Sequence, residues 1–415
     1  MRRRRFLGLA TPVLLAPLLG PRAWSAGTGQ ANVDAMTDTE QTGRTRDSLT
    51  LFLCGDVMTG RGIDQILSHP SSPEIFESYL TSAEQYIEVA ERVSGAIPRP
   101  VDDDYVWGDA LDILRELKPA ARIVNLETAV TISDDNWPGK GIHYRMHPRN
   151  LPVLTAAGVD CCVLANNHVL DWGYEGLSET ISSLSRAGIT TAGAGENLEQ
   201  AAAPAIFAPD DAHRVLVFSL GHGGSGIGKS WQARQDWPGV WLLEELSTAA
   251  VEMIGRRIDG VKRAGDVAVL SIHWGGNWGY GVAAPMQRFA RDLLDHTGVD
   301  LIHGHSSHHP RGIEVHNNRL VLYGCGDFIN DYEGIRGREH YRGDLRVIYL
   351  PQLDPLTGEL RNLSLHVLQA HKFRLRRAGA EDVAWLAGEL DRESRLLGHT
   401  GVVQEGNTLS VRWGQ

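Results

Sequence analysis

The sequence contains few cysteines, and their arrangement excludes a disulfide-stapled fold. Only four occur among 415 residues. Cys54, Cys161, Cys162 and Cys325 all lie in or beside apolar segments, and the adjacent pair has a poor geometry for bridging to each other. Free cysteines in such surroundings usually behave as small buried hydrophobic residues. We therefore expect four buried thiols.

Positive charge and long hydrophobic runs are also scarce. Lys and Arg total 40 against 51 Asp and Glu, which gives a formal net charge of −11. An acidic protein is repelled by nucleic acid and gains nothing from anionic lipid. Beyond the N-terminal segment, no apolar run approaches the roughly 20 residues that span a bilayer. We therefore expect a globular protein that does not bind nucleic acid.

The N-terminal segment has the features of an export signal. Consecutive arginines precede an apolar run and the small-residue exit Ala23-Trp24-Ser25-Ala26. The run is too short and too interrupted by proline to span a membrane, and the arginine pattern fits a twin-arginine signal. We expect residues 1–26 to be this signal and residues 27–48 a disordered leader. The expected location is the periplasm or another extracytoplasmic space, with a membrane anchor if the signal stays uncleaved.

Short apolar segments alternate with helical patterns along most of the remaining chain. The apolar segments are rich in Val, Ile and Leu, which predicts strands covered on both faces. Helices are expected over residues 109–118, 173–188, 247–265 and 285–298. Alternation of this kind predicts a layered α/β architecture, with the ligand site at the carboxyl ends of the strands.

Two parts of the chain depart from this alternation. Residues 64–107 indicate an insertion with a helix over 73–95, and the main domain is expected to cover residues 49–372. Residues 373–415 indicate an appendage packed on that domain, with an amphipathic helix and a final strand.

One apolar segment is followed by the stretch "GHGGSGIGKS", which matches the pattern of a phosphate-binding loop. Gly223, Gly228, Lys229 and Ser230 fit the pattern G-x-x-x-x-G-K-[ST]. A true phosphate-binding loop leads into a long helix, whereas here Pro238 leaves little room for one. The expected extracytoplasmic location offers no appreciable ATP either. We therefore expect no ATP binding and interpret the stretch as a flexible glycine-rich loop near the cleft.

Polar side chains gather where five of the apolar segments end. They are Asp56, Glu127, the trio Asn166-Asn167-His168, His273, and the pair His305 and His308. Carboxylate, amide oxygen and imidazole together suit a divalent transition metal such as Zn, Mn or Fe. A lone aspartate at a strand end is usually a helix cap, and a lone histidine is usually a core residue. The coincidence at five strand ends therefore carries the prediction of one or two metal ions.

These motifs together resemble a known family. The stretches "GDVMTGR", "NLET", "ANNHVLDWGYEGL", "AGAGEN", "HWGG" and "HGHSSHHPRGIEVHNNRLVLYGCGDF" are similar to those of the CapA/PgsA family of capsule and poly-γ-glutamate biosynthesis proteins, within the calcineurin-like metallophosphoesterase superfamily. The likeness covers about residues 49–370. It implies a four-layer α/β/β/α sandwich of the metallophosphatase type with metal ions at one edge. It also implies an anionic polymer or phosphoester as substrate, and membrane synthase subunits as partners.

The resemblance implies a role for each motif residue. Six match metal ligands: Asp56, Glu127, Asn167, His273, His305 and His308. Glu127 occupies the position that bridges two metals in the superfamily. His168 matches the histidine that faces the substrate and is the expected catalytic residue, through oxyanion stabilisation or protonation of a leaving group. Three further residues are expected to contact the substrate: Arg61, Asn166 and Asn277.

One departure from the family pattern bears on catalysis. Superfamily phosphatases usually begin with Asp-x-His, whereas the matching triplet here is Asp56-Val57-Met58, and a methionine sulfur is a poor ligand for these ions. The missing imidazole favours a non-catalytic accessory that binds polymer for a membrane synthase. The retained His168 favours a hydrolase that cuts phosphoester or γ-glutamyl links with metal-activated water. The sequence alone leaves both alternatives open.

Overall fold

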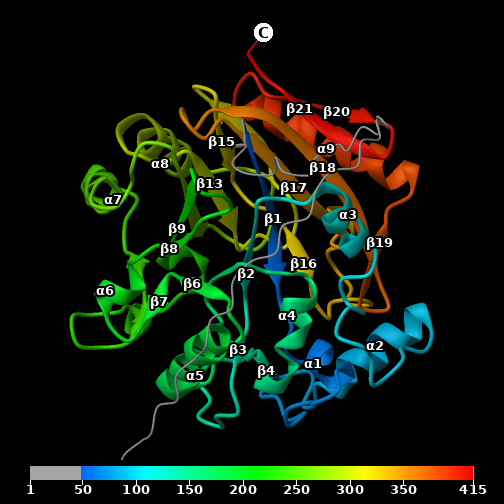
Figure 1. Ribbon diagram of the computed structural model, residues 1–415. Coiled ribbons are helices and arrows are strands. Elements are labelled where there is room, and N and C mark those ends of the chain that lie inside the picture. The colour runs from blue at the N-terminus through cyan, green and yellow to red at the C-terminus, as the bar shows by residue number, and fades with distance from the viewer. Residues whose placement is uncertain (1–47, 415) are drawn as a thin grey trace, which may run out of the picture. The chain divides into compact units, whose positions relative to one another are not determined.

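The apolar segments form the strands of two β-sheets (Figure 1). The structure is a computed structural model that describes residues 48–414, so the expected export signal lies outside the described residues. The first sheet follows the order β20 (Gly401–Glu405), β21 (Thr408–Arg412), β18 (Leu360–His371), β17 (Leu345–Leu353), β1 (Leu49–Val57), β2 (Ala121–Leu126), β5 (Cys161–Val163) and β6 (Thr190–Ala192). Two shorter strands, β16 (Asp327–Ile329) and β19 (Arg374–Arg377), pair with β1 and β18.

The second sheet is smaller and has the parallel strands of the histidine motifs near its centre. Its order is β11 (Leu242–Leu243), β9 (Arg214–His222), β12 (Asp266–His273), β13 (Leu301–His305), β15 (Arg319–Leu322) and β14 (Ile313–His316), with β8 (Ala205–Phe207) beside β9. Two small pairs lie outside both sheets: β3 (Ala129–Val130) with β4 (Arg145–Met146), and β7 (Ala194–Gly195) with β10 (Gly239–Val240).

Side-chain alternation along the strands creates three stacked cores. In β1, Leu51 and Leu53 belong to the core between the two sheets, whereas Phe52 and Cys54 belong to the core beneath the helices. Successive residues of a strand point to opposite faces, so a strand buried on both sides needs an unbroken apolar run. The cysteines follow this rule, since all four are buried and free, as expected.

Helices cover the outer face of each sheet. The first sheet is covered by α1 (Gly62–Ile66), α2 (Glu84–Ser94), α3 (Ala110–Leu117), α4 (Pro152–Ala156) and α5 (Gly173–Arg186). The second is covered by α6 (Leu198–Ala201), α7 (Thr248–Asp259) and α8 (Ala284–His296). Figure 1 shows α7 and α8 on one side of the strands and α2 and α3 on the other. The expected α/β/β/α order of four layers is confirmed.

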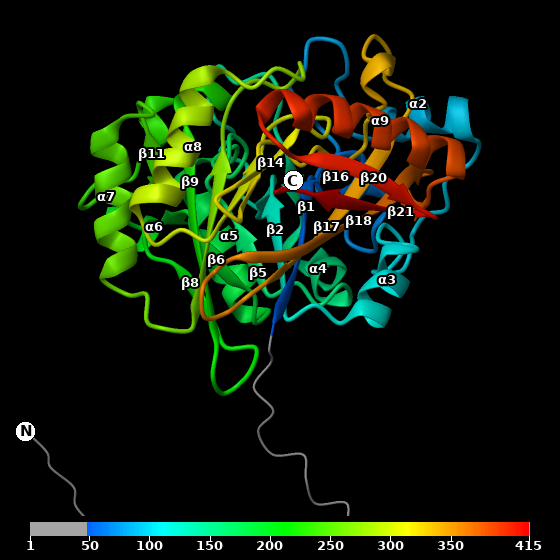
Figure 2. The same ribbon diagram turned by 90° about the horizontal axis from the view of Figure 1, so that it is seen from above.

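The C-terminal segment is continuous with the first sheet. Strand β21 pairs with β18, and α9 (Ala380–Leu397) inserts Val383, Leu386 and Leu390 into the core between the sheets. Figure 2 shows α9 beside β20 and β21. Among the described residues, no helix combines the length and the hydrophobicity that a membrane span requires.

One expected helix is shorter than its pattern. The segment 73–95 was expected to be helical throughout, but only Glu84–Ser94 is helical. Glu77 is buried in an ion pair with Arg61, and Glu74 forms an antiparallel bridge with Ser82, so this stretch is a loop that turns back on itself. The side chain of Gln85 accepts hydrogen bonds from the backbone nitrogens of residues 81 and 82, and the helix begins there. The helices expected over 109–118, 173–188 and 285–298 form close to their expected bounds, whereas the helix expected over 247–265 ends at Asp259.

Candidate metal centre

The carboxyl ends of β1, β2 and β16 place oxygen-bearing side chains in a row. In the parallel ladders, Asp56 lies opposite Asn125 of β2 and opposite Asp327 of β16. Nδ2 of Asn125 donates to Oδ1 of Asp56 at 2.8 Å and to Oε2 of Glu127 at 3.2 Å. All three carboxylates are buried. The first sheet therefore supplies a concentration of negative charge at one point of its edge.

A glycine allows this close approach of β1 and β16. The backbone nitrogen of Asp56 donates to the carbonyl oxygen of Gly326 at 2.9 Å. A Cβ atom on Gly55 would lie 1.9 Å from that oxygen, so no other residue fits at position 55 without moving the strands apart. Gly55 therefore helps to place Asp327 beside Asp56.

The second sheet contributes histidines in the same way. His273 and His305 end neighbouring strands directly opposite each other, and their Nδ1 atoms lie 2.7 Å apart. From the loop after β5, Oδ1 of Asn167 reaches to 2.9 Å from Nε2 of His273. Donor atoms of Asp56, His273 and His305 lie within 4.8 Å of one another. This is the first group of side chains suited to a metal ion.

A second group shares Asp56 with the first. His308 follows β13, and its Nδ1 lies 2.8 Å from Oδ1 of Asp327. Donor atoms of Asp56, His308 and Asp327 also lie within 4.8 Å of one another. Asp56 is therefore the carboxylate common to both groups. Glu127, expected in the bridging position, lies beside them, linked to Asp56 through Asn125.

A chain of hydrogen bonds fixes which nitrogen of His305 carries its proton. The carbonyl oxygen of Cys54 can only accept, so Nε2 of His303, at 2.8 Å, donates to it. Burial lowers the pKa of His303 to about 4, so this ring is neutral and its Nδ1 accepts from Oγ of Ser271 at 3.2 Å. The Ser271 oxygen in turn accepts from Nε2 of His305 at 2.9 Å. Burial also lowers the pKa of His305, so its Nδ1 is unprotonated.

His273 faces His305 with a second unprotonated nitrogen. With Asn167 oriented as it is, Nε2 of His273 donates to the amide oxygen. Burial, with a smaller effect of His168, lowers the pKa of His273, so the ring is neutral and its Nδ1 has no proton. The two unprotonated Nδ1 atoms lie 2.7 Å apart, and their lone pairs repel each other unless a cation binds to them.

The carboxylates show the same need for a cation. Burial and the nearby Asp327 raise the pKa of Asp56 to about 7. Burial and the charge of Asp56 raise the pKa of Glu127 well above its ordinary value. A bound divalent cation would remove both the carboxylate repulsion and the imidazole conflict, and the mixed nitrogen and oxygen donors suit Zn, Mn or Fe. The residues present therefore fit a divalent metal.

His168 lies beside the metal centre in a setting that keeps it neutral. Its Nδ1 lies 2.7 Å from Oδ2 of Asp171 and 3.0 Å from Nζ of Lys140, which also forms an ion pair with Asp171. Burial lowers the pKa of His168 to about 4, because the opposing effect of Asp171 is partly cancelled by Lys140. With its proton donated to Asp171, Nε2 is unprotonated and lies 3.8 Å from Oε1 of Glu127. His168 is therefore suited to accept a proton or hydrogen bond, whereas the expected oxyanion stabilisation or leaving-group protonation would need a proton on Nε2.

Two of the expected substrate contacts are engaged inside the protein. Arg61 is buried, and its guanidinium binds Asp331 and Glu77. Asn166 is also buried: its Nδ2 donates to Asn125 and to a carbonyl oxygen, and its Oδ1 accepts from the backbone nitrogen of His168. Both residues therefore position loops around the centre. Arg61 also lines the cavity beside the centre, and the expected contacts of both residues with substrate stay predictions.

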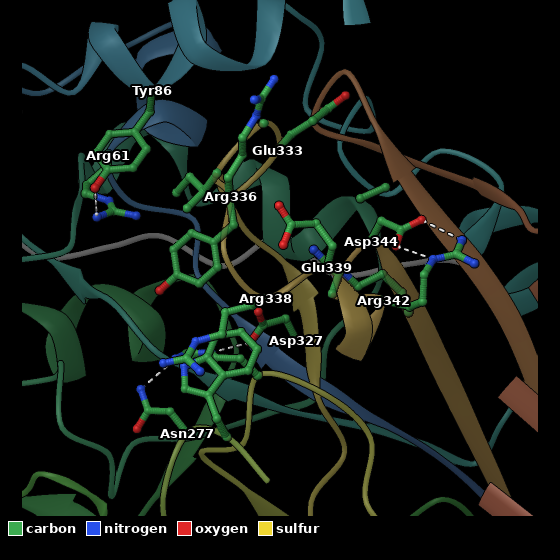
Figure 3. A pocket seen from close by; sticks show the side chains of 18 of the residues that line it. Arg61, Tyr86, Asn277, Asp327, Glu333, Arg336, Arg338, Glu339, Arg342 and Asp344 are labelled. Carbon is green, nitrogen blue, oxygen red and sulfur yellow. Dashed lines mark hydrogen bonds and ion pairs between the residues drawn. The ribbon is translucent and has the colours of Figure 1, made fainter. Parts of the chain in front are cut away.

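Asn277 lies where a cavity opens beside the metal centre. Its Nδ2 is 2.8 Å from Nε2 of His308, and its carbonyl oxygen accepts from the backbone nitrogen of His308. The cavity has a volume of about 510 Å³ and also includes Asp327 in its lining (Figure 3). Asn277 therefore lines the cavity next to His308, and its expected contact with substrate stays a prediction.

The glycine-rich stretch lies next to the centre but does not form a phosphate-binding loop. After β9 it continues into two short 3-10 turns, Gly223–Ser225 and Lys229–Trp231, instead of the long helix such a loop requires. A Cβ atom added at Gly226 would lie 3.5 Å from Nδ2 of Asn167, which shows how closely the loop approaches the ligand residues. Lys229 forms an exposed ion pair with Glu244.

Sequence reasoning missed several residues of the centre. Asp327 follows the apolar run at the start of "LVLYGCGDF", so the signal that predicted the other candidate ligands was present there too. Asn125 is a polar residue inside an apolar strand, which is also a visible signal. Lys140 comes from a polar loop with no distinguishing pattern, and the relay of Ser271 and His303 depends on strand register, which the sequence does not state.

Comparisons with known proteins agree with the motifs. Residues 50–332 match the family model described as "Bacterial capsule synthesis protein PGA_cap". A probable polyglutamine synthesis accessory protein of Mycobacterium tuberculosis is 44% identical over 366 residues, 88% of this chain and 96% of that protein. The PGA biosynthesis protein CapA of Bacillus subtilis is 26% identical, over 71% of this chain and 66% of that protein. A phosphatase structure from Mycoplasma pneumoniae aligns with 78% of this chain and 95% of its own, at 10% identity and a TM-score of 0.42.

Proposed function

Because this chain belongs to the bacterial capsule synthesis protein family, we propose that it acts in the synthesis of an anionic envelope polymer of the poly-γ-glutamate type. The names of its relatives support the polymer, and the N-terminal pattern supports action outside the cytoplasm. Within that role, we propose that the centre cuts a γ-glutamyl or phosphoester link. The observation that carries this proposal is the pair of potential ligand groups sharing Asp56 beside a cavity.

The residues of the centre have separate tasks in this proposal. Asp56, His273 and His305 would hold one divalent cation, and His308 and Asp327 would complete a second position with Asp56. When bound, such cations lower the pKa of a coordinated water and polarise the bond to be cut. His168 presents an unprotonated Nε2 to accept a proton, and Asp171 holds the ring in that tautomer. Asn166 fixes the loop that carries His168.

Asp327 offers a candidate ligand although Met58 stands where the superfamily usually has a histidine. Met58 is buried, and its backbone nitrogen donates to the carbonyl oxygen of Ile329 at 2.7 Å. In the ladder of β1 and β16, Asp327 lies opposite Asp56. The second group therefore contains a carboxylate although the usual first-loop histidine is missing. The alternative is a non-catalytic accessory that binds polymer for a membrane synthase, and the name of the mycobacterial relative, an accessory protein, favours it.

The experiment compares metal-loaded and chelator-treated protein for cleavage of poly-γ-glutamate and of an aryl phosphate. The proposal predicts metal-dependent turnover that falls about 100-fold or more in His168→Ala, while the bound metal content stays unchanged. Asn167→Ala should lower metal retention as well. Metal-dependent binding of polymer without turnover would support the accessory role. Neither binding nor turnover in the metal-loaded protein would contradict the proposed function.

A further inference from the structure

The cavity beside the metal centre has a second wall that the proposed function leaves unused. Asn277, His308 and Asp327 line it on the side of the metal centre. The segment 332–344, between β16 and β17, lines the other side. A volume of about 510 Å³ lies within the range of cavities that hold small organic ligands and exceeds the needs of a single phosphate.

The acidic side chains in this second wall are already bound to protein donors. Asp344 accepts from Nε of Arg342 at 2.8 Å. Glu333 accepts from the backbone nitrogen of Phe373 at 3.0 Å, and Glu339 accepts from the backbone nitrogen of Gly337 at 3.0 Å. Arg342 is in turn shared with a second carboxylate. These groups therefore need no ligand.

Two arginines of the same wall remain without a carboxylate. Within residues 48–414, Arg336 and Arg338 form no ion pair, and both are exposed. The guanidinium carbon of Arg338 lies 5.3 Å from the centre of the Trp278 ring, which lies 5.4 Å from the ring of His308. Trp278 thus supports a cation near the metal centre. Figure 3 shows Arg338 on the side of Asn277 and Asp327, and Arg336 on the side of Glu333.

We propose that this wall is a subsite for the free carboxylates of a γ-glutamyl chain. Arg338 binds the carboxylate nearest to the metal centre, and Arg336 binds one further along the chain. A chain with one free carboxylate per repeat can supply one carboxylate to each of the two arginines. Guanidinium groups bind carboxylates through two parallel hydrogen bonds, so the fit is chemical as well as electrostatic. This inference rests on the proposed function and adds the residues that recognise the polymer.

The test measures binding of a γ-linked glutamate pentamer to the full-length, metal-loaded protein by titration calorimetry. The matched control is Arg256→Ala on α7, which removes the same charge from a side chain that is 70% exposed and distant from the cavity lining. We expect Arg338→Ala to raise Kd about tenfold and Arg336→Ala to raise it a few-fold. Arg256→Ala should leave Kd unchanged, and all three variants should keep the metal content of the wild type.

The outcomes separate this inference from the proposed function. If the wild type binds the pentamer and Arg338→Ala binds equally well, the subsite is wrong while the polymer role stands. Equal weakening by Arg338→Ala and Arg256→Ala would show a general charge effect and would also overturn the subsite. If the metal-loaded wild type binds no pentamer at all, both the subsite and the polymer role fail.

Discussion

Ser271 and His303 matter because they lie one strand repeat behind the ligand pair His273 and His305. Residues two apart on a strand share a face, and the two strands are in register, so the four side chains form one column. Because the Cys54 carbonyl accepts from His303, each hydrogen bond along the column points toward Cys54, and His305 donates from Nε2. The Nδ1 of His305 is therefore free to bind a cation. Such outer partners commonly set the basicity and orientation of metal-binding histidines.

Breaking this relay should weaken metal binding without unfolding the protein. Ser271→Ala removes the oxygen that links His303 and His305. We expect the affinity for Zn²⁺, measured by competition with a chromophoric chelator, to fall by about 10-fold to 100-fold. Ser219→Ala is the matched control, because Ser219 is the register partner of Ser271 on β9 and its buried hydroxyl has no partner within the described chain. Equal affinities of the two variants would show that the relay has no role.

Lys140 and Asp171 act on His168 with opposite signs. Lys140 lowers the pKa of His168 because a nearby ammonium disfavours a protonated ring, and Asp171 raises it. Lys140→Met should therefore raise the pKa from about 4, and Asp171→Asn should lower it further. Titration of the ring carbon signal by NMR in metal-free protein measures both changes. A pKa that falls in Lys140→Met, or rises in Asp171→Asn, would contradict this account of the site.

At the scale of elements, Arg61 joins three segments that border the cavity. It precedes α1 and binds Asp331 just after β16. It also binds Glu77, which precedes α2, and Tyr86, which lies in α2. The ring of Tyr86 also stacks against the guanidinium, with 3.8 Å between its centre and the central carbon. The ion pair of Arg61 with Glu77 thus helps to hold the segment before α2 as a loop, which helical periodicity alone did not predict.

Removing Arg61 should strongly destabilise the fold. Arg61→Met leaves the buried carboxylates of Asp331 and Glu77 without a cation, which costs about 3–5 kcal/mol in the free energy of unfolding. Urea denaturation followed by tryptophan fluorescence measures the change. The exposed pair of Arg256 and Glu252 provides the contrast, because Arg256→Met should cost about 0.5 kcal/mol or less. A loss below about 1 kcal/mol for Arg61→Met would contradict a central structural role.

Most elements could be predicted because local patterns determine them. Continuous apolar runs gave the core strands, and helices such as α5 and α8 follow their amphipathic periodicity. The missed features depend on contacts between distant segments. The pairing of β16 with β1 brings Asp327 to Asp56. The nearby contact of Arg61 with Asp331 likewise joins residues that are 270 positions apart in the sequence. Register of this kind has no local signature.

At the scale of the whole molecule, the two sheets bring their polar ends to one place. The first sheet contributes mainly carboxylates and the second mainly imidazoles, and Asp56 participates in both groups. Strand-end position predicted that these residues would meet, because parallel strands of an α/β layer end at a common edge. The sequence could not predict that Asp56, rather than Glu127, is the shared carboxylate, since this depends on how the two sheets face each other.

The central claim is that this meeting point is a metal centre built on Asp56. Elemental analysis of the purified protein after equilibration with Zn²⁺, Mn²⁺ or Fe²⁺ and desalting tests it most directly, beside Asp56→Asn. The account predicts at least one tightly held ion per chain in the wild type and its loss in a folded Asp56→Asn variant. A wild-type protein that retains no metal ion, or an Asp56→Asn variant that retains the full content, would contradict it.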